Sequence, residues 1–112
     1  MKVINIAMQF TTVPAGRYPS DGEYSGQRFR EELLVPSLKR EDCVIVEIDG
    51  TAGYGSSFLE EAFGGLVRKG YYTAPQLHKK LEIRTADPSY RTYKASIWRF
   101  IDQAKREMAD AN

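Results

Sequence analysis

The sequence contains a single cysteine, Cys43, and a single histidine, His78. One cysteine forms no disulfide within the chain, and one cysteine with one histidine is too few for a Cys/His zinc site. Cys43 opens an apolar run, Cys43–Val46, where a buried and unreactive thiol is expected. His78 lies in a polar segment and is interpreted as a surface residue. We therefore expect no metal site, no cofactor and no catalytic pair of nucleophile and base.

Long apolar runs are also missing. No segment approaches the ~20 apolar residues that cross a bilayer, and the start Met1–Asn5 does not have the pattern of a signal peptide. The formal net charge is +1, from 16 basic and 15 acidic residues, so no excess of either sign points to nucleic acid or to a membrane surface. We expect a cytoplasmic protein that binds neither, folded as a single domain over residues 1–112.

The first half of the chain alternates between strand and helix signals. Apolar residues at every second position from Ile4 to Phe10 predict a first strand. Thr11–Tyr24 is rich in proline and glycine and predicts a long loop. Ser25 is the predicted N-cap of a helix that Pro36 should end or kink. The β-branched run within Asp42–Ile48 then predicts a buried strand of a parallel sheet.

The second half repeats this alternation. Ser57, with Glu60 three residues later, predicts a capping box at the start of a helix with one apolar face. Leu81–Thr85 is a predicted third strand. Asp87–Pro88 has the pattern of an N-cap followed by a first-turn proline, and it predicts a final helix that runs to about Ala109.

The predicted order of elements is therefore β-α-β-α-β-α, which places the chain in the α/β class. Alternation of this kind indicates a mainly parallel sheet of three or four strands, with helices packed on it and right-handed crossovers. In such a sheet the strand ends and the following helix starts meet at one edge, where binding sites gather. The loop Pro14–Tyr24, the turn Ser25–Gly26 and the turn Gly50–Ser57 are predicted to meet there.

The segment Val44–Leu59, VIVEIDGTAGYGSSFL, resembles a known signature. It is similar to that of STAS domains, which include anti-sigma-factor antagonists and the cytosolic domains of sulphate transporters. Their pattern is a strand, an acidic residue, a turn, and Asp-Ser-Ser-Gly-Leu at the start of a helix. Glu47 takes the acidic position and Ser56–Ser57 take the serine pair, whereas Gly55 and Phe58 replace the flanking Asp and Gly.

A closer resemblance is to a STAS-like family of unassigned function. Its members have Ser-Gly-x-x-Phe-Arg at the first helix, which is similar to SGQRFR at Ser25–Arg30. They have Ser-Phe-Leu-x-Glu-Ala-Phe-Gly-Gly-Leu at the second, which is similar to SFLEEAFGGL at Ser57–Leu66. The resemblance extends from about Arg17 to the last helix, and it implies a small STAS-like domain.

The resemblance also implies a function. In antagonist proteins the first serine of the pair accepts a phosphate, and that role maps onto Ser56. Ser57, the second serine of the pair, is a further candidate phosphoacceptor. The implied function is a regulatory, partner-switching module that binds a protein. The implied partner is a kinase-like ATP-binding regulator or a similar signalling protein, contacted through the second helix and the turn before it.

The residues themselves extend this candidate surface. An arginine near two helix N-termini could hold an anion or a phosphoserine, which singles out Arg17 in the long loop. Glycines inside a helix are costly, so Gly64–Gly65 indicate close packing either of another helix of the domain or of a partner. The candidate binding surface is Arg17, Tyr18, Ser25, Gly26, Asp49, Gly55, Ser56, Glu60, Glu61, Gly64 and Gly65.

Two other functions remain open on the sequence alone. One is a domain that binds a small anion or a nucleotide without turnover. The other is an enzyme that uses Arg17, Asp49 and Ser56 at the same sheet edge. We do not expect an enzyme, because no base is paired with a nucleophile. The sequence leaves the oligomeric state open.

Overall fold

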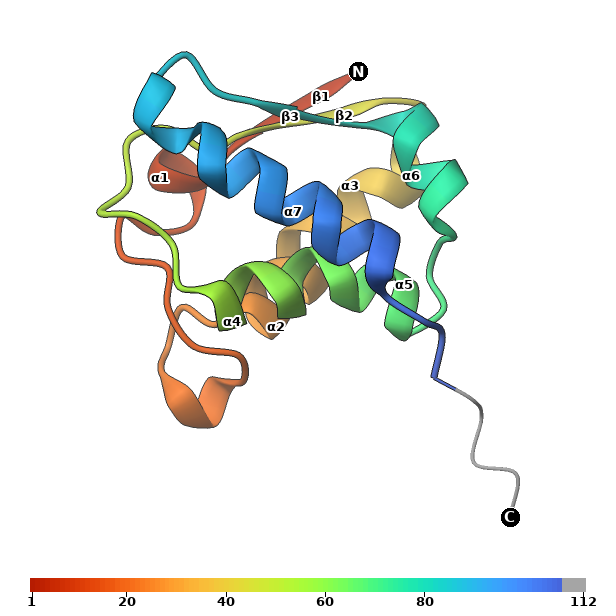
Figure 1. Cartoon of the computed structure of the whole chain (residues 1–112), viewed down its shortest axis with the longest axis horizontal. Coiled ribbons are helices and arrows are strands. Elements are labelled where there is room, and N and C mark those ends of the chain that lie inside the picture. Colours follow the sequence, from red (N-terminus) through yellow and green to blue (C-terminus); the bar gives the residue numbers. More distant parts are fainter. Residues whose placement is uncertain (108–112) are drawn as a thin grey trace.

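The computed structural model describes residues 1–107, and it contains one sheet of three parallel strands (Figure 1). The strands are β1 (Lys2–Asn5), β2 (Val44–Glu47) and β3 (Leu81–Arg84), in the order β1-β2-β3. The register aligns Ile4 with Val46 and Val46 with Ile83. The predicted α/β class with a parallel sheet is confirmed.

Helices connect the strands and follow the last one. The helical segments are α1 (Ile6–Gln9), η1 (Pro19–Asp21), α2 (Gly26–Phe29), η2 (Arg30–Leu34), α3 (Val35–Arg40), α4 (Ser56–Leu59), η3 (Glu60–Gly64), α5 (Gly65–Arg68), α6 (Ala74–Lys80), η4 (Pro88–Tyr90) and α7 (Arg91–Gln103). Of these, η2 and η3 are single π-helical segments, and each joins its neighbours into one continuous helix.

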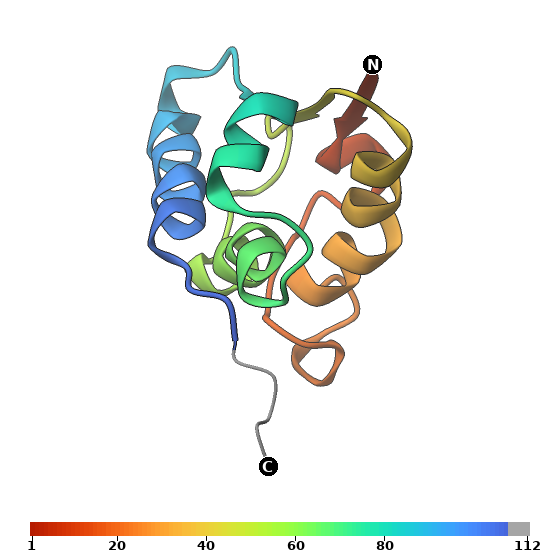
Figure 2. The same ribbon diagram turned by 90° about the vertical axis from the view of Figure 1, so that its right-hand side faces the viewer.

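The core lies between the sheet and the helices. α2 to α5 and α7 lie on one side of the sheet (Figure 1), and the continuous helix α4–α5 lies between α7 and α2–α3 (Figure 2). Ile4, Val46 and Ile83 point toward these helices and are at most 1% exposed. On β3, Glu82 and Arg84 alternate with the buried residues and are exposed, as strand periodicity requires.

The first strand is shorter than predicted. It ends at Asn5, whose side chain accepts a hydrogen bond from Met8 N at 3.0 Å and caps the short helix α1. The prediction of a strand through Phe10 is therefore wrong. The asparagine cap begins a helical turn at Ile6, so the alternating apolar residues after Asn5 do not belong to the strand.

Pro36 does not end the first long helix. Ser25 caps that helix as predicted and accepts from Arg28 N at 3.2 Å. Helical residues then continue through η2 and α3 to Arg40. In the π-helical turn before Pro36, Val35 N bonds to Arg30 O, which shifts the hydrogen-bond ladder just before the residue that has no N–H.

The helix after β2 begins differently from the prediction. It starts at Ser56, and its N-cap is Gly55, which provides no side-chain hydrogen bond. The predicted capping box of Ser57 with Glu60 is wrong. The Glu60 carboxylate instead binds the guanidinium groups of Arg17 and Arg68.

The last part of the chain holds one unpredicted helix and one that is shorter than expected. α6 was missed, although Thr73 and Gln76 form a capping box at its start. Asp87 caps the following segment as predicted, accepting from Ser89 N at 2.9 Å. α7 ends at Gln103, and the remainder of the helix predicted to Ala109 falls partly beyond the described residues. Among the described residues no helix is both long enough and apolar enough to cross a membrane.

Candidate functional site

Two loops meet at the carboxyl edge of the sheet. The loop after β1 and the loop after β2 are joined by a hydrogen bond from Ala52 N to Thr12 O at 2.8 Å. The Tyr90 hydroxyl, from the start of the last helix, donates to Thr51 O. Figure 1 shows both loops at the end of the molecule where α1 lies. The predicted meeting of sequence-distant loops at this edge is confirmed.

A shallow depression of about 370 Å³ lies between these loops. Small and apolar side chains form most of its wall, and Tyr93 of α7 closes one side. Its lining is Val13, Pro14, Ala15, Ala52, Gly53, Tyr54, Gly55 and Tyr93. None of these side chains is charged, and polar and apolar atoms share the exposed wall about equally. A shallow hollow of this composition suits contact with a protein surface.

Exposed apolar residues lie at the same edge of the sheet. Met8 of α1 is 86% exposed and Val13 is 57% exposed. A single exposed apolar side chain needs no explanation, but two at the edge that carries this depression indicate a contact surface. We call the depression, with Met8 and Val13, the edge face.

Ser56 borders the edge face. It follows Gly55 of the depression directly and is exposed, as is Ser57. The first backbone hydrogen bond of the helix runs from Leu59 N to Gly55 O at 3.2 Å. The amides of Ser56, Ser57 and Phe58 precede that bond and have no partner in the helical ladder. Exposed hydroxyls and helix-end amides therefore lie together.

Asp49 has a different role from the one predicted. Its carboxylate accepts hydrogen bonds from Ala86 N at 2.7 Å and from the Thr85 hydroxyl. These bonds tie the end of β2 to the end of β3. The carboxylate is thus used within the fold and does not line the depression.

Arg17 is also engaged. Its guanidinium forms ion pairs with Glu60 and with Glu61, the latter at 3.1 Å. The hydrogen bond to Glu60 raises the pKa of Arg17 above its usual value, although partial burial opposes the shift. The predicted anion-holding role is not supported, because the guanidinium of Arg17 is already engaged by two carboxylates of the fold.

A buried ion pair lies behind Arg17. Arg30 Nη1 lies 2.6 Å from Glu61 Oε2 and also donates to Glu61 O at 2.5 Å. Arg30 is 3% exposed and Glu61 is 1% exposed. Sequence reasoning did not select Arg30, although it closes the Ser-Gly-x-x-Phe-Arg motif. Its fixed position within a family motif was the available signal.

Glycines allow this pair to form. A Cβ at Gly26 would lie 2.4 Å from Phe58 O, so α2 and α4 touch backbone to backbone. A Cβ at Gly65 would lie 2.2 Å from Arg30 Nη1, and one at Gly64 would lie 2.7 Å from Glu60 Oε2. Gly64 and Gly65 therefore face the domain's own residues. The alternative that they contact a partner is wrong.

Much of the predicted binding surface is consequently interior. Ser25, Gly26, Glu61, Gly64 and Gly65 are all buried. All five lie within the two family motifs, and those motifs encode helix packing here. Of the predicted residues, Gly55 lines the depression and Ser56 follows it.

Four residues of the predicted binding surface, Arg17, Ser25, Asp49 and Ser56, do not surround one concave surface. Arg17 faces the carboxylates of η3, Ser25 is a buried cap and Asp49 binds the end of β3. Tyr18 is 46% exposed and lines a separate cavity with Lys69 and other residues. Only Ser56 keeps the predicted place on an exposed surface beside the loops.

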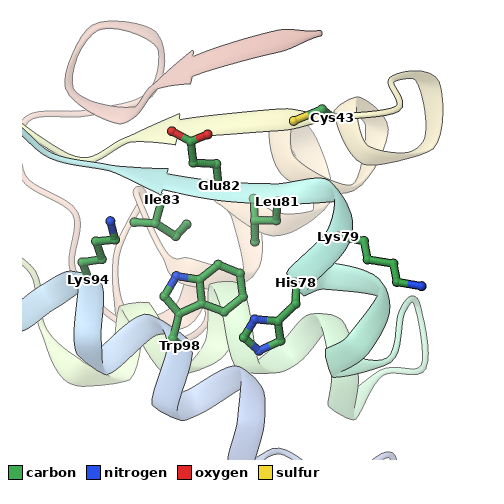
Figure 3. Close-up of a pocket in the computed structure, with 8 residues that line it drawn as sticks. All are labelled: Cys43, His78, Lys79, Leu81, Glu82, Ile83, Lys94 and Trp98. Atoms are coloured by element: carbon green, nitrogen blue, oxygen red, sulfur yellow. The ribbon is translucent and has the colours of Figure 1, made fainter.

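His78 lies at the opposite edge, as predicted, because α6 leads into β3. Its ring stacks on Trp98 with centroids 4.4 Å apart (Figure 3). The Nε2 of His78 lies 2.7 Å from Asp102 Oδ1. Cys43, which was expected to be buried, is a half-buried free thiol. Within residues 1–107, no group of three or more His, Cys, Asp or Glu side chains is placed to hold a metal ion.

Three parallel strands with helices packed on one side, and a serine pair at the start of the helix after the second strand, define an α/β domain of the STAS-like type. The chain belongs to the family described as STAS-like domain of unknown function (DUF4325), whose model matches residues 25–91. This match contains both motifs and begins after Arg17. No curated protein and no solved structure is similar enough to be matched.

Proposed function

We propose that this domain is a regulatory module that binds a protein partner through the edge face and that it performs no catalysis of its own. The observation that carries the proposal is the depression of about 370 Å³ that exposed Val13 lines, with exposed Ser56 directly after it in the chain and exposed Met8 at the same edge of the sheet. Protein interfaces have apolar and aromatic centres, and Val13 with Tyr93 supplies both.

Ser56 is the proposed control point. A phosphate there adds a charge of about −1.5 to −2 at neutral pH. The free amides at the start of the helix and the positive end of its dipole would stabilise that charge. The same charge would stand at the rim of an apolar contact, where desolvation opposes binding. Phosphorylation is therefore expected to keep the fold and release the partner.

The proposed partner follows from the family resemblance. STAS antagonists are controlled by kinase-like ATP-binding regulators, and such a regulator would both bind the edge face and modify Ser56. Arg17 has no part in the proposed contact with the partner, because its guanidinium is paired with Glu60 and Glu61. Contact through the buried part of the second helix is likewise left out.

The two alternatives have less support. A small-anion or nucleotide site was expected to use Arg17, which is neutralised within the fold. An enzyme was expected to combine Arg17, Asp49 and Ser56, but Asp49 ties two strands together and does not line the depression beside Ser56. Neither alternative uses the apolar side chains of the edge face.

The experiment is affinity capture followed by mass spectrometry with three forms of the chain. Val13→Asp places a charge in the edge face, and Tyr18→Asp places the same charge on an exposed residue elsewhere. We expect a partner that the parent and Tyr18→Asp capture and Val13→Asp does not. A partner captured equally by all three, or lost only with Tyr18→Asp, would contradict the proposed face.

A further inference from the structure

Among residues 1–107, no strand pairs with the outer edge of β3. β3 is the last strand of the sheet, and β2 occupies only one of its sides. Ile48 N donates to Arg84 O at 3.1 Å, so the backbone of Arg84 faces β2. Because successive residues of a strand face opposite sides, the N–H and C=O of Ile83 point to the free edge. Such an edge is a template for another strand.

The space beside this edge is open. A cavity of about 300 Å³ has Cys43 and Glu82 in its lining from one face of the sheet and Ile83 and Trp98 from the other. Figure 3 shows Trp98 on the side of β3 opposite to Glu82. This cavity extends past the outer edge of β3 from one face of the sheet to the other. It therefore lies where a neighbouring strand would run, about 4.8 Å from β3.

We propose that β3 of a second copy of this chain occupies this space, antiparallel to the first and related to it by a twofold axis at Ile83. The two Ile83 residues would exchange both of their backbone hydrogen bonds, as directly opposed residues do in an antiparallel pair. The three-stranded sheets would join into one sheet of six strands. Such an interface is isologous, so each copy offers the same surface.

Charge selects this occupant. With the axis at Ile83, Glu82 of one copy lies opposite Arg84 of the other, and the reverse pair forms as well. Both side chains lie on the outer face of the sheet, 54% and 47% exposed, and within one copy they form an ion pair with each other at 3.3 Å. Across the twofold axis each would exchange this partner for the same residue of the other copy. They form a non-hydrogen-bonded pair of the ladder, in which opposed side chains are closest and opposite charges stabilise.

Other pairings of like strands are less favourable. An axis at Leu81 would need the Leu81 N–H, which already donates to Leu77 O at the end of α6. β1, at the other edge, carries one charged residue, Lys2, so no self-pairing register there matches opposite charges. The charges on β3 therefore oppose pairing with an unrelated strand, but they favour pairing with β3 of a second copy in a single register.

The test is sedimentation equilibrium over a concentration series. We expect the parent chain to dimerise, and Glu82→Arg and Arg84→Glu each to raise the dissociation constant at least tenfold by opposing like charges. An equimolar mixture of these two variants restores opposite charges at both pairs and should form a heterodimer as tight as the parent. The double variant should dimerise like the parent as well.

Two further measurements place the interface. Glu23→Arg makes the same charge change in the loop before α2 and should leave association unchanged. The Ile83 amide should gain protection from hydrogen exchange as concentration rises. A parent chain that stays monomeric up to about 1 mM, the weak limit of specific association, would overturn the proposal. A dimer that ignores both charge reversals, or a mixture that fails to associate, would overturn it too.

Discussion

Glu61 is held by three arginines that come from different parts of the chain. Arg30 binds one carboxylate oxygen at 2.6 Å, and Arg17 and Arg68 bind the other at 3.1 and 3.0 Å. Burial alone would raise the pKa of Glu61. The hydrogen bonds from Arg30 and Arg17 and the nearby positive charges outweigh burial, so the pKa lies below its ordinary value.

Glu61→Gln should therefore be strongly destabilising. The amide keeps the size of the side chain but leaves Arg30 buried without its main counter-charge, and such losses cost about 3 to 5 kcal/mol. We expect a loss of about 3 kcal/mol in the free energy of unfolding at pH 7, measured by urea titration. Glu23→Gln, at a carboxylate that is 73% exposed, should change it by less than about 0.5 kcal/mol.

The same variant has a pH signature. Because the folded-state pKa of Glu61 is lowered, its contribution is fully present above the ordinary value of about 4.3 and is lost as pH falls through the folded pKa. The stability difference between the parent and Glu61→Gln should therefore shrink below about pH 4. A difference that is constant from pH 7 to pH 3 would contradict the assignment.

Residue roles were only partly predictable. Ser56 was selected from its alignment with the serine pair of the family signature, and the structure leaves it exposed at the start of α4. The capping role of Ser57 could not be tested from sequence, because the choice depended on where Arg17 and Arg68 would take the Glu60 carboxylate. Arg17 is distant from Glu60 in the sequence, and Arg68 lies more than one helical turn after it. The local pattern around Ser57 and Glu60 therefore included neither arginine.

At the scale of elements, the two family motifs describe how one helix pair packs. Gly26 brings α2 against the backbone of α4 at Phe58, and Gly65 leaves room for Arg30. The buried pair of Arg30 with Glu61 then joins the two π-helical segments. The motifs thus specify the arrangement that supports the start of α4, rather than a reactive site.

Gly26→Ala should separate this helix pair. Its Cβ would lie 2.4 Å from a backbone oxygen, which no side-chain rotation relieves. Overpacking of this kind costs about 1 to 3 kcal/mol, and we expect the upper end. Gly55→Ser is the matched control, since nothing lies within 4 Å of its Cβ. It should stabilise slightly by adding an N-cap acceptor. Equal thermal midpoints for the two variants would contradict this packing.

Three elements differ from the sequence-based prediction: the end of β1, the end of α7 and the helix α6. Ile6 has the spacing of a strand residue, but Asn5 begins a helical turn before it. α7 ends at Gln103, after which Glu107 N donates to Arg68 O at 2.7 Å, so a contact with α5 replaces the helical hydrogen bonds. α6 differs, because the pair of Thr73 and Gln76 was present in the sequence and was overlooked.

The overall fold was the most predictable aspect of the protein. The alternation of strand and helix signals fixes a parallel sheet whose loops meet at one edge, and this survives errors of several residues at element ends. The edge face could not be foreseen, because Val13, Ala52 and Tyr93 come from three segments whose approach depends on the packed fold. Val13 and Tyr93 belong to no motif, and Ala52 lies in the turn of the Val44–Leu59 signature.

A single domain of this size should unfold in one cooperative step. Trp98, the one tryptophan of the chain, lies between α7 and α6 and reports on tertiary packing. We expect its fluorescence and the far-ultraviolet circular dichroism to give coincident urea transitions. Separate midpoints for the two probes would show that part of the chain folds independently, against the prediction of one domain.

The central claim is that a protein partner binds the edge face and that charge at Ser56 controls it. The most direct measurement is the dissociation constant of the captured partner for the parent, Ser56→Asp, Ser56→Ala and Ser20→Asp, the last adding the same charge in η1. Ser56→Asp should bind about 5- to 150-fold more weakly, the usual range of such coupling, with unfolding free energy within about 0.5 kcal/mol of the parent. Ser56→Ala and Ser20→Asp should bind normally. Binding of Ser56→Asp as tight as the parent would contradict the claim.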